Sequence, residues 1–225
     1  MPRRAAVPSA TTLRAIKCLL FVACAVPLAH LAWAAWQDDL GANPIEAITR
    51  GLGTWTLNFL LITLTVTPLR KLTGLDWLVR LRRMLGLYTF FYACLHLMTY
   101  VWLDQFFDWS AIVHDIAKRP FITVGFAAWL LLLPLAVTST NAMMRWLGGR
   151  RWQRLHRSVY AIGVLAVLHY WWLVKKDVTL PLVYALVLAL LLALRAVRRR
   201  APPPASGKLA ARPAATFVKP APDQA

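Results

Sequence analysis

The chain has 225 residues, 59% of them hydrophobic, and its 26 Lys and Arg against 9 Asp and Glu give a formal net charge of +17. Soluble domains are about 45–50% apolar and about 25% charged, whereas only 16% of this chain is charged. A nucleic-acid-binding protein of this charge would not need 11 Trp and long apolar runs, so the composition favours a multi-pass membrane protein surrounded by lipid, with its basic residues sorted to one side.

Six apolar segments follow one another along the chain, and each is long enough to be read as a membrane span. A helix needs about 20 residues to cross the hydrocarbon core, so a chain of this length holds about six spans and little soluble domain. The segments are Ile16–Trp36, Leu52–Pro68, Met84–Leu103, Pro120–Val137, Val159–Val174 and Leu180–Leu194. We expect an all-α integral membrane bundle of six transmembrane helices over residues 16–195, after a cytoplasmic N-terminal segment of residues 1–15.

The basic residues divide unequally between the two sides of this bundle. Threading the spans in order places 21 of the 26 cations on the side that holds both termini and the second and fourth loops. The opposite side has five cations and seven of the nine acids. The positive-inside rule therefore predicts that both termini are cytoplasmic. Because the chain has no organelle-targeting signal, we expect a bacterial inner membrane.

The last segment, residues 196–225, differs in character from the rest of the chain. It is basic and rich in Ala and Pro, with no apolar periodicity. Such a composition cannot bury a core, so we expect a disordered cytoplasmic tail.

Two histidines are expected at the same depth on different spans. His96 lies 13 residues past Arg83, which is about 20 Å along its helix from the basic edge. His169 lies 12 residues past Arg157, or about 18 Å. An ionisable side chain inside a span marks a functional site by default, and two imidazoles at one level suit the axial positions of a haem iron. Alternatively, each histidine is only hydrogen-bonded within the bundle.

A second cofactor site is expected at the cytoplasmic edge, formed by His156, Arg82 and Arg83. Arg82 lies 14 residues before His96 and within about 40° of its face on a straight helix. Cations at this level suit an anionic group, such as haem propionates or a flavin phosphate, better than a second bis-histidine iron. Ordinary anchoring at the cytoplasmic edge explains the same arginines, and the sequence leaves both interpretations open.

The other two histidines are weaker candidates. His30 lies in the outer half of the first span, where it is either a third ligand or a polar residue facing the bundle or the outer interface. His114 lies in an outer loop among Asp104, Asp108 and Asp115. We expect His114 to be solvated, and the acids of its loop would serve either as a wet surface or as a guide for a basic partner.

Three separated motifs resemble those of one known family. The motifs are RLRRMLGLY followed by His96, RPFITVG over residues 119–125, and RWQRLHRSVY followed by His169. They are similar to the MsrQ (earlier YedZ) family, the haem-binding membrane subunit of the periplasmic protein-methionine-sulfoxide reductase system. That family belongs to the ferric-reductase-like transmembrane superfamily, which also holds the NADPH oxidases. The similarity covers roughly Ile16 to Arg195.

The resemblance implies an electron-transfer subunit with no catalytic residue of its own. Electrons would come from the quinone pool or a cytosolic flavin reductase and pass to a periplasmic molybdopterin enzyme, MsrP, which reduces methionine sulfoxide in oxidised envelope proteins. The implied cofactors are haem b and FMN. The axial ligands carry over to His96 and His169, and the third family histidine to His156. His30 matches no motif of the family.

Two other functions stay open at this stage. One is a self-contained ferric reductase or NADPH-oxidase-like enzyme. The sequence argues against it, because the chain has no GxGxxG nucleotide-binding motif and no room for a nucleotide-binding domain. The other is a non-redox membrane scaffold whose histidines are structural.

Overall fold

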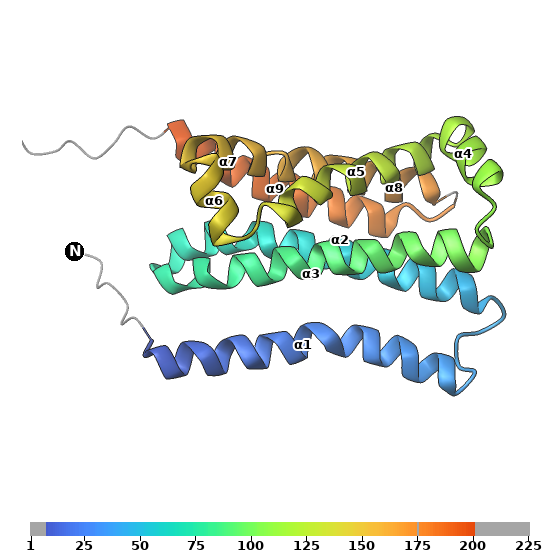
Figure 1. Ribbon diagram of the computed structural model, residues 1–225, viewed down its shortest axis with the longest axis horizontal. Coiled ribbons are helices and arrows are strands. Elements are labelled where there is room, and N and C mark those ends of the chain that lie inside the picture. The colour runs from blue at the N-terminus through green and yellow to red at the C-terminus, as the bar shows by residue number, and fades with distance from the viewer. Residues whose placement is uncertain (1–7, 175, 201–225) are drawn as a thin grey trace, which may run out of the picture.

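The computed structural model of the chain describes residues 8–174 and 176–200, and it is all-helical within them, as the sequence predicts (Figure 1). In chain order the elements are α1 (Ala10–Trp36), α2 (Pro44–Thr73), the short 3₁₀ helix η1 (Asp76–Leu78), α3 (Val79–Met98), the π-helical turn η2 (Thr99–Asp104), α4 (Trp109–Lys118), α5 (Pro120–Val137), α6 (Asn141–Leu147), α7 (Gly149–His156), α8 (Val159–Leu173) and α9 (Thr179–Arg200).

Each of the six predicted segments overlaps one long helix, in the order α1, α2, α3, α5, α8 and α9, although α2 already begins at Pro44 and α3 passes into the π-helical turn after Met98. Within the described chain, five helical stretches are long and apolar enough to cross a membrane, the third of them running from η1 through η2. The exception is α8, which has 15 residues and is therefore about 22 Å long. Two residues separate it from α7, a short basic helix. Helix α9 continues to Arg200, while residues 201–225 of the predicted tail lie outside the described residues.

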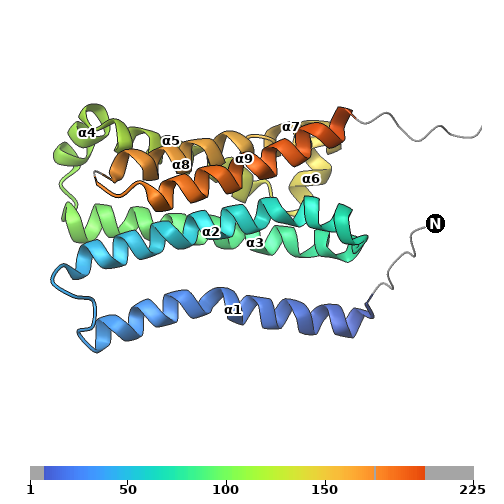
Figure 2. The same ribbon diagram turned by 180° about the vertical axis from the view of Figure 1, so that it is seen from behind.

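The long helices lie side by side in layers (Figures 1 and 2). Helix α1 forms one outer layer, α2 and α3 form the middle, and α5, α8 and α9 form the far side. Helix α4 lies at one end of the bundle, which we call the α4 end. The first turn of α1, the last turn of α9, and α6 and α7 lie at the opposite end. We call it the basic end, because α7 and the start of α3 each carry three arginines.

Helix α2 supplies side chains to two separate cores. Leu60 and Leu64 pack with Ile162 of α8 and Leu188 of α9 in the larger cluster. Phe59 belongs to the second cluster, between α1, α2 and α3. Burial on both faces makes α2 the central helix of the fold, and its close packing positions the helices on either side of it.

The caps of α2 explain where this central helix begins and ends. The Asn43 side chain accepts a hydrogen bond from the Glu46 backbone N–H at 3.2 Å, and Pro44 occupies the first helical position. Both choices favour a helix start. The helix ends at Gly74, whose φ of 71° lies in the left-handed region that only glycine adopts at no steric cost.

A tyrosine hydroxyl from α3 is inserted at the proline kink of α1. Pro27 lies inside α1 and cannot donate a backbone hydrogen bond. The fully buried Tyr92 hydroxyl accepts from the Leu28 N–H at 3.1 Å and donates to the Cys24 carbonyl at 2.8 Å. It thus bridges the two backbone groups that an unbroken helix would join directly, and it fastens α1 to α3.

We expect Tyr92→Phe to destabilise the protein by about 1–2 kcal/mol, because it leaves a buried donor and a buried acceptor without this partner. Tyr88→Phe is the matched control. The Tyr88 hydroxyl donates to the Phe21 carbonyl at 2.9 Å, and among the described hydrogen bonds it accepts none from α1. Thermal unfolding of both variants in detergent measures the difference. Equal losses of stability in the two variants would contradict the bridging role.

Candidate functional site

His96 of α3 and His169 of α8 face each other in the bundle. The centroids of their rings lie 6.1 Å apart, and the ring planes cross at 74°. His169 also lies against the Phe121 ring of α5, at 6.3 Å between centroids. Both histidines are partly buried. The helices thus bring together the two imidazoles that the sequence predicts at one depth. Their role as ligands stays a prediction.

The inner nitrogen of each imidazole is held by a backbone carbonyl. His96 Nδ1 lies 2.9 Å from the Thr49 carbonyl oxygen, and His169 Nδ1 lies 2.6 Å from that of Phe121. A carbonyl can only accept, so each bond requires the proton on Nδ1 and leaves the Nε2 lone pair free. This is the tautomer that a metal-ligating histidine needs, with its other ring N–H bonded to an acceptor.

The spacing of the two rings fits a metal between them. An imidazole nitrogen binds a transition metal at about 2 Å, so two rings that ligate from opposite sides have centroids about 6 Å apart. The observed 6.1 Å agrees with that value. A porphyrin supplies four further nitrogens in the plane between two axial ligands. The residues present therefore fit the axial positions of a haem.

The α3 helix changes character just beyond His96. The π-helical turn η2 begins at Thr99, whose hydroxyl donates to the His96 carbonyl at 2.8 Å. From this turn the Tyr100 hydroxyl donates to Asp115 at 3.2 Å, and Asp115 also pairs with Arg119 at 3.1 Å. Turns of this kind occur frequently at functional sites. Here the turn connects the helix of His96 to α4 and to the start of α5.

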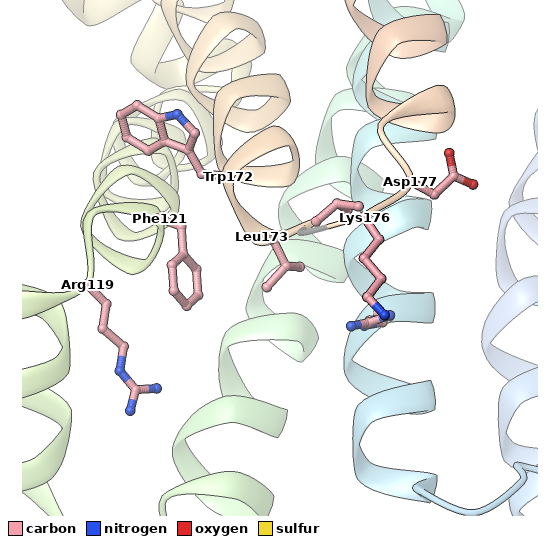
Figure 3. Close-up of a pocket in the computed structure, with 8 residues that line it drawn as sticks. Arg119, Phe121, Trp172, Leu173, Lys176 and Asp177 are labelled. Carbon is pink, nitrogen blue, oxygen red and sulfur yellow. The ribbon is translucent and has the colours of Figure 1, made fainter.

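A pocket of about 880 Å³ opens at the α4 end, beside both carbonyl acceptors (Figure 3). Arg50, which follows Thr49, and Phe121 both line it. Figure 3 shows Arg119 and Phe121 near the start of α5, and Lys176 on the connection between α8 and α9. Of these cations, Arg50 pairs with Glu46 at 2.5 Å and Arg119 pairs with Asp115. The carboxylate of Asp177 also lines the pocket, so the pocket is a recess of mixed charge next to the histidine pair.

His156 is the centre of a second cluster at the basic end. Its ring stacks on Trp152 at 3.9 Å, and its Nδ1 lies 3.1 Å from the Trp152 carbonyl oxygen. Burial lowers the pKa of His156 below its usual value, and the positive charge of nearby Arg82 lowers that pKa further. Arg82 therefore lies within electrostatic reach of His156. Arg83 instead is exposed and donates to Asn141 of α6 at 3.1 Å, so it does not join them.

Arg195 also belongs to this cluster. The sequence predicts it only as one of the many cations on the cytoplasmic side. It donates to the Leu64 carbonyl at 2.7 Å and to the Tyr160 hydroxyl, and its guanidinium lies 5.1 Å from the Tyr160 ring centroid. It lies within electrostatic reach of Arg82. Helical spacing would have found it, because Arg195 shares a face of α9 with the buried Leu188 and Leu191.

The remaining two histidines lie at exposed positions. His30 is exposed on α1, the outer helix of the bundle, and His114 is exposed on α4. Neither is in the His96–His169 pair described above.

Comparisons with known proteins found clear similarities. Residues 50–167 match the family described as ferric reductase like transmembrane component. The chain is 62% identical over 193 residues to a protein-methionine-sulfoxide reductase heme-binding subunit, MsrQ, of Azospira oryzae, covering 85% of this chain and 83% of that protein. MsrQ of Herminiimonas arsenicoxydans is 55% identical over 84% of this chain and 87% of its own length. MsrQ of Rhodospirillum rubrum is 59% identical over 80% and 88%. No solved structure matches the chain.

Proposed function

Because the chain belongs to the MsrQ family of ferric-reductase-like transmembrane proteins, the heme-binding subunits of a methionine sulfoxide reductase system, we propose that it is a b-type cytochrome that carries electrons across the bacterial inner membrane. The acceptor would be a periplasmic molybdopterin enzyme of the MsrP kind. That partner, and not this chain, would reduce methionine sulfoxide in oxidised envelope proteins. The charge asymmetry along the sequence supports an orientation with both termini in the cytoplasm.

The single observation that carries the proposal is the facing pair His96 and His169. Their Nδ1 protons are committed to carbonyl oxygens and their Nε2 lone pairs are free. We assign them as axial ligands of a haem b, whose iron, when bound, accepts and releases single electrons. The two carbonyls orient the rings, and the tightly packed helices keep the rings at one separation. The pair lies near the α4 end of the bundle, which the proposed orientation makes periplasmic.

The cluster at the basic end would hold a second cofactor. Arg82, Arg195 and His156 offer cationic and imidazole groups to an anion, either the propionates of a second haem or the phosphate of FMN. Arg195 Nε is buried and has no hydrogen-bond partner in the described part of the chain. A buried polar atom without a partner is costly, and a bound anion would supply one.

Two cofactors at these two levels would let electrons cross the bundle in steps. The donor at the basic end would be a quinol from the membrane pool or a cytosolic flavin reductase. The pocket at the α4 end lies beside the outer histidines and is lined by Arg50, Arg119 and Lys176. This position suits the exit of electrons toward a periplasmic partner.

Electron delivery to the partner tests the proposal directly. The purified chain in liposomes is reduced with a ubiquinol analogue, or with a flavin reductase and NADH, and mixed with an MsrP-type enzyme and methionine sulfoxide. We expect the haem absorption to return to the oxidised form as methionine is produced. Omission of methionine sulfoxide is the control. Haem that stays reduced in the full mixture with both donors would overturn the assignment of the acceptor.

A further inference from the structure

Each histidine of the facing pair is backed by a glycine, one helical turn after the carbonyl that holds it. The Thr49 carbonyl of α2 accepts from His96, and Gly53 follows four residues later. The Phe121 carbonyl of α5 accepts from His169, and Gly125 follows four residues later. Two helix pairs, α2 with α3 and α5 with α8, thus use the same arrangement at the same spacing.

Helix geometry explains why a glycine is needed at that spacing. In an α-helix the carbonyl of residue i points toward residue i+4, with which it shares a hydrogen bond. The side chain of residue i+4 is therefore the nearest lateral cover over that carbonyl. A glycine there removes the cover and exposes the carbonyl to a donor from a neighbouring helix. Glycine is otherwise less favourable than alanine inside a helix.

The distances show how little room a side chain would have. A Cβ on Gly125 would lie 2.7 Å from His169 Nδ1 and 2.8 Å from Cε1, closer than real Cβ contacts come. A Cβ on Gly53 would lie 3.0 Å from His96 Cε1 and 3.2 Å from Nδ1. The first contact would force the His169 ring to move. The second would press on the His96 ring with less overlap.

We propose that Gly53 and Gly125 are positioning residues for the two axial histidines: each opens one backbone carbonyl so that it can hold Nδ1–H and aim Nε2 at the shared iron. This inference rests on the proposed haem between His96 and His169. An acceptor on Nδ1 raises the basicity of the ligating nitrogen and so stabilises the oxidised iron. The two glycines therefore determine both the placement of the ligands and the reduction potential of the haem.

The test replaces each glycine by alanine in the full chain, purified with its haem. Gly125→Ala should weaken haem retention about 10–100-fold, the range for loss of an outer-shell partner, and should shift the remaining haem toward the high-spin form. Gly53→Ala should keep more haem but raise its midpoint potential, because the Thr49 bond to His96 lengthens. Absorption and EPR spectra, haem content and a redox titration measure these effects independently of electron transfer to a partner.

Two glycines of the same chain serve as matched controls. A Cβ on Gly51, on the same helix as Gly53, would also meet a side chain at 3.0 Å, but that side chain is Leu31. A Cβ on Gly163 of α8 would meet Leu188 at 3.1 Å. Gly51→Ala and Gly163→Ala crowd the bundle without touching an imidazole. They should change thermal stability and leave the haem spectrum and potential unchanged.

The outcomes separate this inference from the proposed function. If Gly53→Ala and Gly125→Ala keep the wild-type spectrum and potential while His96→Ala and His169→Ala lose the haem, the positioning role is wrong and the haem assignment holds. If all four glycine variants change the spectrum alike, the effect is general packing damage, which also overturns the positioning role. If the histidine variants keep the haem, the ligand assignment itself fails.

Discussion

Replacing His96 or His169 by Ala should abolish the low-spin b-type absorption of the purified protein. Each variant removes one of the two imidazoles whose rings lie 6.1 Å apart. If both imidazoles ligate the haem iron, the one that remains would leave the iron high-spin or let the haem dissociate. The loss should be complete in either single variant, because the two ligands act on the same iron. Absorption spectra of the reduced and oxidised protein, together with the haem content per chain, measure it.

His114→Ala and His30→Ala are the controls for this experiment. Both residues are exposed in the structure, on α4 and α1, so both variants should keep the wild-type spectrum. They remove the same side chain without touching the facing pair. Unchanged low-spin spectra in both His96→Ala and His169→Ala would refute the axial assignment. A purified wild-type protein with no Soret band would refute haem binding altogether.

The second large effect is expected at the basic end. Arg82→Gln and His156→Ala should each lose the inner cofactor, whether haem or FMN, while the outer haem stays bound. Arg82 carries a positive charge next to His156, which is partly buried and stacked on Trp152. Removing either group takes a charge-assisted or imidazole contact from an anionic cofactor. Haem and flavin are quantified separately for each purified variant.

Arg83→Gln provides the matched control, because Arg83 is the neighbouring arginine on the same helix and is exposed, donating to Asn141. We expect it to keep the full cofactor content. Retention of every cofactor in both Arg82→Gln and His156→Ala would remove the inner site from the proposal. Equal losses in Arg82→Gln and Arg83→Gln would indicate a general effect of basic charge at this end.

The sequence predicts the helical class and the position of the six long helices, and the structure confirms both. Helix α8 agrees with its predicted segment to one residue: it ends at Leu173, and the apolar segment ends at Val174, just before a run of charged residues. A cofactor site at the basic end stays a prediction. Arg82 lies within electrostatic reach of His156, Arg83 donates to Asn141 instead, and Arg195, which was not expected there, donates to the Leu64 carbonyl. Adjacent residues on a helix differ by about 100° in direction, so a pair such as Arg82 and Arg83 cannot share one face.

The sequence alone predicts which segments are apolar, which end of the bundle is basic, and that His96 and His169 share a level. These properties depend on composition and on a constant rise per residue, so they can be counted along one chain. The packing of the helices, in contrast, sets which backbone carbonyl holds each histidine. The Thr49 and Phe121 carbonyls, the space left by Gly53 and Gly125, and the approach of Arg195 to Leu64 all depend on how neighbouring helices are rotated against each other. That rotation is set by many weak packing contacts acting together, and no local stretch of sequence contains them.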